Sequence, residues 1–169
     1  IKDLTNFLNS AGAKIKWFGR TCKILGTNSL NQTEYTVMAD RIEAGTFCVA
    51  ATLTRGNLEI KDFNFNIIRT ELELLKKAGA KIKIDNNKIK IIGPEKIKSV
   101  KNIKTREWPG VATDMQSQLM VLMCRADGTS SITENIFENR FLHVGELQRL
   151  GANIQICLLY TSPSPRDGL

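Results

Sequence analysis

The sequence predicts an α/β protein assembled from repeated helix–strand–strand units, and an internal repeat is the first observation that predicts it. Three segments end in the same way, "LTNFLNSAGAKIK", "LELLKKAGAKIK" and "VGELQRLGANIQI". Their glycines, Gly12, Gly79 and Gly151, lie 67 and 72 residues apart. A repeat of this period indicates a supersecondary unit that occurs several times along the chain.

Each copy of the repeat has the same physical pattern. Leucines at i and i+3 or i+4 before the glycine predict an amphipathic helix. The glycine can take a left-handed conformation that closes the last helical turn. Alternating lysine and isoleucine after it predict a strand with one wet face. A second short strand, "TCKILG" or "NKIKIIG", follows the first two copies.

The middle copy is complete enough to show what precedes the repeat. Residues 40–56 predict a helix with Asp40 as N-cap and Glu43 three residues later, as in a capping box. Residues 57–63 predict a strand, and a helix around 67–78 and a hairpin at 81–93 follow. The full unit is therefore helix, strand, helix, strand, strand.

The last copy begins in the same way and is predicted to stop partway. Thr113 is the expected N-cap of a helix that ends near Arg125, with Gln116 at its third position, and "TSSITENIF" predicts a strand. After Ile156 the repeat requires a turn and a return strand. Residues 157–169 instead contain two prolines, so we expect a non-native or disordered tail.

Composition excludes several classes. The net charge is +7, but the lysines alternate with isoleucines and no aromatic residues are interleaved with them, so a solvated sheet face is favoured over nucleic-acid binding. No apolar run suits a membrane span, and no signal peptide is visible. The first residue is not Met, so a fragment is expected.

The four cysteines match no zinc spacing. Cys48 and Cys124 lie in apolar helical stretches and are expected to be buried and inert. A reducing cytoplasm fits these thiols best.

Three motifs carry a specific resemblance. They are "DRIEAGTF" (40–47), "TDMQSQ" (113–118) and "ITENIFENRFLHVGELQRLGA" (132–152). With these motifs in this order, the chain closely resembles the enolpyruvyl transferases that act on UDP-N-acetylglucosamine, from about Leu4 to Ile156. It is less similar to the shikimate-pathway enolpyruvyl transferase, which lacks "TDMQ" and "FENRF" in this form.

The resemblance implies a fold and a domain division. Members of the family have two domains, each an inside-out α/β barrel of three units, with the active site in the cleft between them. Residues 1–38 would be the end of the first domain. Residues 39–156 would be part of the second, and residues 157–169 the tail.

The resemblance also implies a reaction. The family transfers the enolpyruvyl group of phosphoenolpyruvate to the 3-hydroxyl of UDP-N-acetylglucosamine and releases phosphate, the first committed step of peptidoglycan synthesis. We therefore expect a cytoplasmic transferase with two small-molecule substrates and no metal or organic cofactor. No nucleic-acid or membrane partner is expected, and the oligomeric state stays open.

Asp114 matches the family aspartate that contacts the sugar hydroxyl and is proposed as the base. At a helix start, the partial positive charge stabilises its ionised form, so it accepts a proton only if closure expels water. The alternative is a carboxylate that merely complements the helix dipole. Ile136 matches a position that contacts the sugar nucleotide, through its backbone because its side chain has no polar atom; otherwise it is a core strand residue.

Glu138 and Arg140 match a segment that lines the cleft. On a strand-like segment they would point to one side, and the alternative is a surface ion pair. Asp40 and Arg41 match a family motif, although the cap role is favoured for Asp40. His143 is the single histidine of the sequence and is expected to be structural.

Other family residues have no counterpart here. The loop cysteine and the cations that hold phosphoenolpyruvate would precede the matched region, so this chain alone is expected to be inactive. Two alternatives stay open. One is a non-catalytic α/β repeat domain that binds a nucleotide or a protein partner. The other is an enolpyruvyl transferase with a different acceptor, such as shikimate 3-phosphate.

Overall fold

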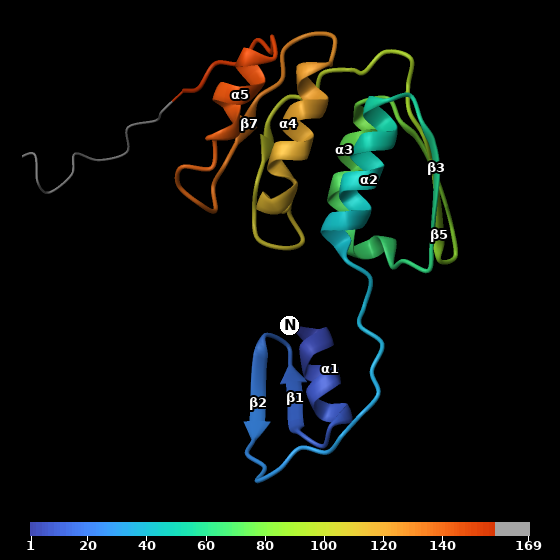
Figure 1. Cartoon of the computed structure of the whole chain (residues 1–169), viewed down its shortest axis with the longest axis vertical. Helices are drawn as coiled ribbons and strands as arrows, with labels where there is room; N and C mark the ends of the chain where they lie inside the picture. Colours follow the sequence, from blue (N-terminus) through green and yellow to red (C-terminus); the bar gives the residue numbers. More distant parts are fainter. Residues whose placement is uncertain (158–169) are drawn as a thin grey trace, which may run out of the picture. The chain divides into compact units, whose positions relative to one another are not determined.

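The structure of the protein is a computed structural model that describes residues 1–157. The chain divides into two compact units, Ile1–Asp40 and a second that begins at Arg41. Helices and strands alternate along both (Figure 1), so the mixed α/β class predicted from the sequence is confirmed.

The first compact unit contains one copy of the repeat. Helix α1 (Lys2–Ser10) is followed by strands β1 (Lys14–Phe18) and β2 (Thr21–Leu25), which pair antiparallel with Ile15 opposite Ile24. The Asn9 side chain bonds both backbone groups of Ile15 at 2.9 Å, which fixes the helix against the strand.

The three repeat glycines all adopt the left-handed conformation that the sequence predicted. Their φ angles are +101° at Gly12, +107° at Gly79 and +93° at Gly151. In each case the N–H of the following alanine donates to the carbonyl five residues earlier, at 3.0 Å. This is the Schellman ending of a helix, for which glycine is the favoured residue because it has no Cβ.

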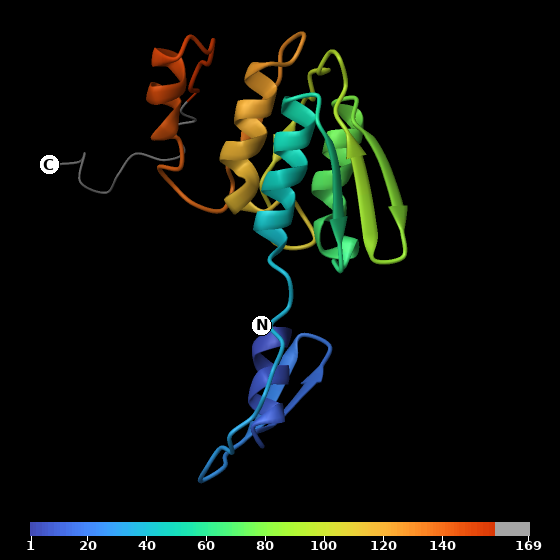
Figure 2. The same cartoon turned by 45° about the vertical axis from the view of Figure 1, so that its right-hand side comes forward.

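The second compact unit holds the full middle copy. It contains α2 (Arg41–Leu53), β3 (Asn57–Lys61), the 3₁₀ helix η1 (Phe65–Ile68), α3 (Arg69–Lys77), β4 (Lys81–Asp85) and β5 (Lys88–Ile92). The strands form an antiparallel sheet in the order β3-β5-β4. Helices α2 and α3 cover one face of it (Figures 1 and 2), and residues of both helices and of the sheet belong to the main hydrophobic core.

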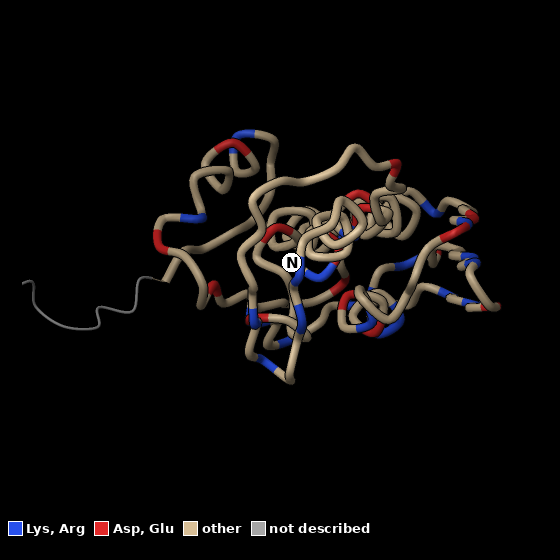
Figure 3. The backbone as a smooth tube through the Cα atoms, turned by 90° about the horizontal axis from the view of Figure 1, so that it is seen from below, with Lys and Arg blue, Asp and Glu red and all other residues tan. Residues whose placement is uncertain are grey.

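The predicted two-sided character of the hairpin is confirmed on its central strand. Ile89 and Ile91 of β5 are fully buried, while Lys88 and Lys90 face solvent. On the edge strand β4 the pattern weakens, because Ile84 is 49% exposed. Figure 3 shows basic and acidic positions interspersed along the backbone.

The last part of the chain is less regular. It contains β6 (Ile103–Lys104), the 3₁₀ helix η2 (Thr113–Met115), α4 (Gln116–Cys124), β7 (Ile132–Thr133) and α5 (His143–Arg149). Strands β6 and β7 pair in parallel. Helix α4 packs beside α2, where Gly45 makes room for the Met115 side chain.

Two sequence predictions about strands are wrong. The strand predicted at 129–137 is confined to Ile132–Thr133 because the next residue, Glu134, draws the N–H groups of Ile136 and Phe137 out of any ladder. The strand expected after Gly151 does not form within residues 152–157, where no described strand lies alongside to pair with it. The predicted return strand and nearly all of the predicted tail fall in 158–169, outside the described residues.

The predicted cap at Thr113 is also wrong. Its hydroxyl donates to Glu134 instead of accepting from the helix, and the Gln116 side chain is buried rather than reaching back. Helix α4 begins at Gln116, and η2 precedes it with no side-chain cap. Asp40, by contrast, directly precedes α2, where the cap was predicted, and Glu43 lies in its first turn.

The expectation for the cysteines is half confirmed. Cys48 is fully buried, and burial raises the pKa of its thiol to about 12. Cys124 is exposed at the end of α4, so the expectation that it is buried is wrong. Among residues 1–157 no helix has the length and apolar character needed to cross a lipid bilayer.

Candidate functional site

Asp114 lies in the 3₁₀ turn η2 that leads into α4, and its side chain is 54% exposed. Helix α3 fixes the residues that precede this turn. The buried carboxylate of Glu71 accepts the Ala112 N–H at 3.0 Å, and the Thr70 hydroxyl donates to the Pro109 carbonyl at 2.6 Å. Two consecutive residues of α3 therefore hold the backbone on which Asp114 is presented to solvent.

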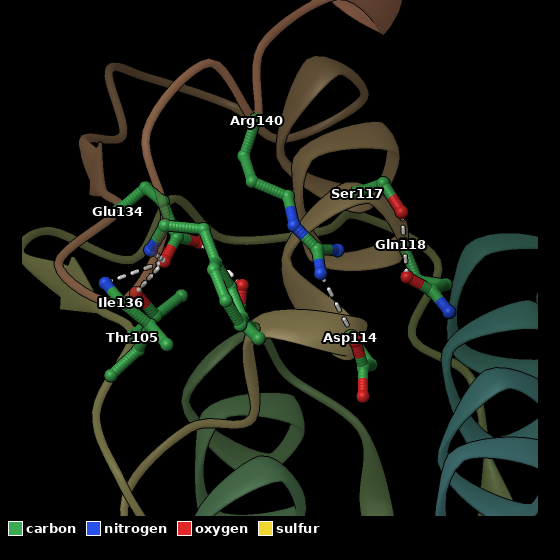
Figure 4. A network of polar contacts seen from close by, with 9 residues as sticks. Thr105, Asp114, Ser117, Gln118, Glu134, Ile136 and Arg140 are labelled. Atoms are coloured by element: carbon green, nitrogen blue, oxygen red, sulfur yellow. Dashed lines mark hydrogen bonds and ion pairs between the residues drawn. The ribbon is translucent and has the colours of Figure 1, made fainter.

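Arg140 reaches Asp114 from a different segment. Its guanidinium lies 3.6 Å from the Asp114 carboxylate, and it stacks over the Phe137 ring with 4.9 Å between Cζ and the ring centroid. Figure 4 shows the Arg140 side chain pointing at Asp114. The segment that carries Arg140 is a turn, in which Asn139 has a φ of +56°. The prediction of a strand-like segment for Glu138 and Arg140 is therefore wrong.

Glu134 connects the two segments. Its Oε1 accepts hydrogen bonds from the Ile136 N–H at 2.8 Å, the Phe137 N–H at 3.2 Å and the Thr105 hydroxyl at 2.8 Å. Its Oε2 accepts from the Thr113 hydroxyl at 2.9 Å. Burial of this carboxylate raises its pKa, but these hydrogen bonds outweigh that effect, and the pKa of Glu134 is lowered overall.

Ile136 and Glu138 lie near this pair without joining it. The Ile136 N–H is already bonded to Glu134, so a ligand contact through that group would have to compete with the carboxylate. The Ile136 side chain is 36% exposed, so it is not the core strand residue of the alternative reading. Glu138 is exposed, and among the described residues no hydrogen bond or ion pair links it to Asp114 or Arg140.

The single histidine begins α5. His143 is half-buried, its Nε2 has no hydrogen-bond partner among the described residues, and burial lowers its pKa. The imidazole is therefore neutral near pH 7, which fits the structural role predicted for it. Within residues 1–157 no three His, Cys, Asp or Glu side chains gather in a way that could hold a metal ion.

Sequence reasoning missed Glu134 and Glu71. Glu71 is buried on the core face of α3, four residues before Leu75 and on the same side of the helix. A charged residue at a core position is the signal that could have identified it, since buried carboxylates need partners. For Glu134 the signal is weaker. It is an acidic residue directly after a strand, close enough in sequence to accept from the N–H groups two and three residues later.

The fold of this chain is that of the enolpyruvyl transferases. It matches the enolpyruvyl transferase NikO from Streptomyces tendae with a TM-score of 0.70 at 26% identity, over 87% of this chain and 36% of that one. An EPSP synthase from Acinetobacter baumannii matches with a TM-score of 0.57 at 23% identity, over 76% of this chain and 31% of that one, which bears on the fold alone.

The sequence assigns the chain to a family within that class. It belongs to the EPSP synthase (3-phosphoshikimate 1-carboxyvinyltransferase) family, whose model matches residues 1–164. Within the family it is similar to the UDP-N-acetylglucosamine 1-carboxyvinyltransferase of Pelagibacter ubique (strain HTCC1062), with 54% identity over 157 residues. UDP-N-acetylglucosamine 1-carboxyvinyltransferase 1 of Clostridium perfringens (strain 13 / Type A) is 50% identical over 161 residues.

Both alignments cover 92% of this chain but only 37% and 38% of the relatives. The chain therefore spans little more than a third of the length of the proteins it matches. The resemblance predicted from the three motifs is confirmed at the level of the family and of these relatives.

Proposed function

We propose that this chain is part of a transferase that moves the enolpyruvyl group of phosphoenolpyruvate to the 3-hydroxyl of UDP-N-acetylglucosamine and releases phosphate. The observation that carries the proposal is the exposed pairing of Asp114 with Arg140, 3.6 Å apart. The identity of 47–54% to proteins that carry this activity in their names supports it.

Each member of the pair has a chemical task in this proposal. Asp114 accepts the proton of the sugar hydroxyl, which requires that its carboxylate be reachable, and in η2 its side chain is 54% exposed. Arg140 supplies a planar cationic fork suited to carboxylate or phosphate groups. Ile136 and Glu138 line the sugar-nucleotide side of the site.

The wider reading follows from the same proposal. Residues 1–38 belong to the end of one domain, 39–156 to part of a second, and the complete domains form inside-out α/β barrels. The activity serves peptidoglycan synthesis, and therefore cell shape and division, in the cytoplasm. It uses two small-molecule substrates and needs no nucleic acid, membrane or cofactor.

A chimera tests the proposal. The 157 residues of the Pelagibacter ubique relative that match this chain would be replaced by those of this chain, and phosphate release measured with both substrates. We expect release only when phosphoenolpyruvate and UDP-N-acetylglucosamine are both present. Replacing the proton acceptor in Asp114→Asn should lower kcat by about 10²–10⁴-fold, the usual contribution of general base catalysis.

The matched control is Asp127→Asn, an aspartate at the opposite end of α4 whose backbone, not its carboxylate, bonds to Ile97 and Ser99. It should retain the activity of the unsubstituted chimera. Equal activity of Asp114→Asn and Asp127→Asn would contradict the role of Asp114 as base.

A second acceptor is favoured by one observation, the description of the matching family as 3-phosphoshikimate 1-carboxyvinyltransferase. The same chimera offered shikimate 3-phosphate in place of the sugar nucleotide decides between the two. Turnover of phosphoenolpyruvate with shikimate 3-phosphate but not with UDP-N-acetylglucosamine would replace the proposed acceptor. The reaction class would stay unchanged.

A further inference from the structure

We propose that Glu134 is a positioning residue for this site. Its carboxylate fixes the segment 134–140 against the turn that carries Asp114, so that Arg140 reaches Asp114 and the Ile136 backbone is held beside them. This inference rests on the proposed function. It adds to the site a residue that acts without contacting the substrate.

The hydrogen bonding of Glu134 shows that it acts through its neighbours. An ionised carboxylate accepts about four hydrogen bonds. Glu134 already accepts four, from Thr105, Thr113, Ile136 and Phe137. Oε1 accepts three of these bonds and Oε2 accepts one, so most of the acceptor capacity of Glu134 is used to hold two loops together (Figure 4).

The anchor of this arrangement lies in the core. Thr105 is fully buried, and its N–H donates to the Thr133 carbonyl at 3.0 Å. Its hydroxyl donates to Glu134 and accepts the Asn135 N–H at 2.9 Å. The buried Thr105 thus fixes the Glu134 carboxylate. The carboxylate in turn holds Thr113 in one exposed segment and Ile136 in the other.

This carboxylate and the ion pair both join the two exposed segments. Thr113 is the residue before Asp114, and Ile136 lies four residues before Arg140. The Asp114–Arg140 pair is too exposed to order both segments by itself, since exposed ion pairs contribute little. Bonds to an ionised acceptor are roughly twice as strong as neutral ones, so Glu134 is the stronger constraint.

The test uses the same chimera with four substitutions in this chain's residues. Glu134→Ala removes all four hydrogen bonds. Glu134→Gln keeps a carbonyl acceptor for the Ile136 and Phe137 N–H groups. Thr113→Val removes a single donor with little change of shape, and Glu146→Ala removes an exposed carboxylate on α5 that pairs with Arg149.

We expect Glu134→Ala to lower kcat/KM for the sugar nucleotide by about 10²-fold, the cost of displacing a catalytic group by roughly 1 Å. Both KM and kcat should change, because the binding backbone and the base move together. Glu134→Gln should recover activity to within about tenfold of the unsubstituted chimera, since it restores the two backbone bonds. Thr113→Val should show a smaller loss of the same kind, and Glu146→Ala none.

A second readout separates positioning from general stability. The assays are run well below the unfolding temperature of every variant. Amide hydrogen exchange of Ile136 and Phe137 is measured in parallel, and it shows whether the loop is released while the fold persists. Unchanged kcat/KM in Glu134→Ala, or a loss that follows only the unfolded fraction, overturns the proposal. So does Glu134→Gln behaving no better than Glu134→Ala.

Failure of this inference is distinguishable from failure of the proposed function. If the unsubstituted chimera transfers nothing to UDP-N-acetylglucosamine, the proposed function fails and the role of Glu134 fails with it. If the unsubstituted chimera is active and Glu134→Ala is equally active, only the positioning role fails.

Discussion

The second and third copies of the repeat share a sequence pattern but differ in what surrounds them. Helix α3 and Gly79 lead into β4 and β5, and α3 contributes Leu72 and Leu75 to the main core. Helix α5 and Gly151 have the same local geometry, yet no strand follows within residues 152–157. The comparison teaches that the helix and its glycine ending are set locally, whereas the strand needs a neighbour with which to pair.

The leucine two residues before the last helical position gives the largest test of this difference. Leu75 is 1% exposed in the core, while Leu147, at the equivalent place in α5, is half-buried. Leu75→Ala should lower the free energy of unfolding by about 2–5 kcal/mol through the cavity it leaves. Leu147→Ala should cost about 1 kcal/mol, because less surface is removed from contact. Urea denaturation of both variants measures this, and equal losses would contradict the comparison.

The two glycines give a smaller and sharper test. Both have φ near +100°, so alanine is strained at either position, by about 1–2 kcal/mol. At Gly79 an added Cβ would also lie 3.2 Å from Pro94, whereas at Gly151 it meets nothing within 4 Å. Gly79→Ala should therefore lower the melting temperature more than Gly151→Ala. Similar shifts would mean that Pro94 gives way at no cost.

Acid should affect the two regions unequally. The lowered pKa of Glu134 means that its stabilising contribution is fully present above its ordinary value of 4.5 and is lost as the pH falls through the lowered folded value. From pH 6 to pH 3 we expect the Ile136 and Phe137 amides to lose protection from hydrogen exchange before those of Ile89 and Ile91 in the sheet. Simultaneous loss at all four amides would indicate a single global transition instead.

The sequence predicted the locally determined parts of the fold well. Helices α1, α2 and α3, the hairpin β4–β5 and the three left-handed glycines all follow from periodicity and helix-ending chemistry. The strand predicted at 129–137 and the cap predicted at Thr113 failed for one reason. Glu134 takes up both the Thr113 hydroxyl and the N–H groups that a strand would have used, a tertiary contact that no local pattern contains.

The candidate site was predictable only in part. Motif resemblance selected Asp114, Ile136, Glu138 and Arg140, and the structure places Asp114 against Arg140. The motif resemblance could not indicate that Glu71 and Glu134 hold the two segments, because both carboxylates bond to groups that are distant in sequence. Glu71 reaches Ala112 across 41 positions, and Glu134 reaches Thr113 across 21.

The way in which Glu71 and Glu134 hold their partners has an evolutionary consequence. Both carboxylates bond to main-chain N–H groups, of Ala112 in one case and of Ile136 and Phe137 in the other. Every residue except proline offers that group, so these hydrogen bonds do not depend on which side chains stand at 112, 136 and 137. Inserting or deleting one residue in either loop would shift the N–H groups out of register. The hydrogen bonds of these loops should therefore survive amino-acid substitutions far better than insertions or deletions.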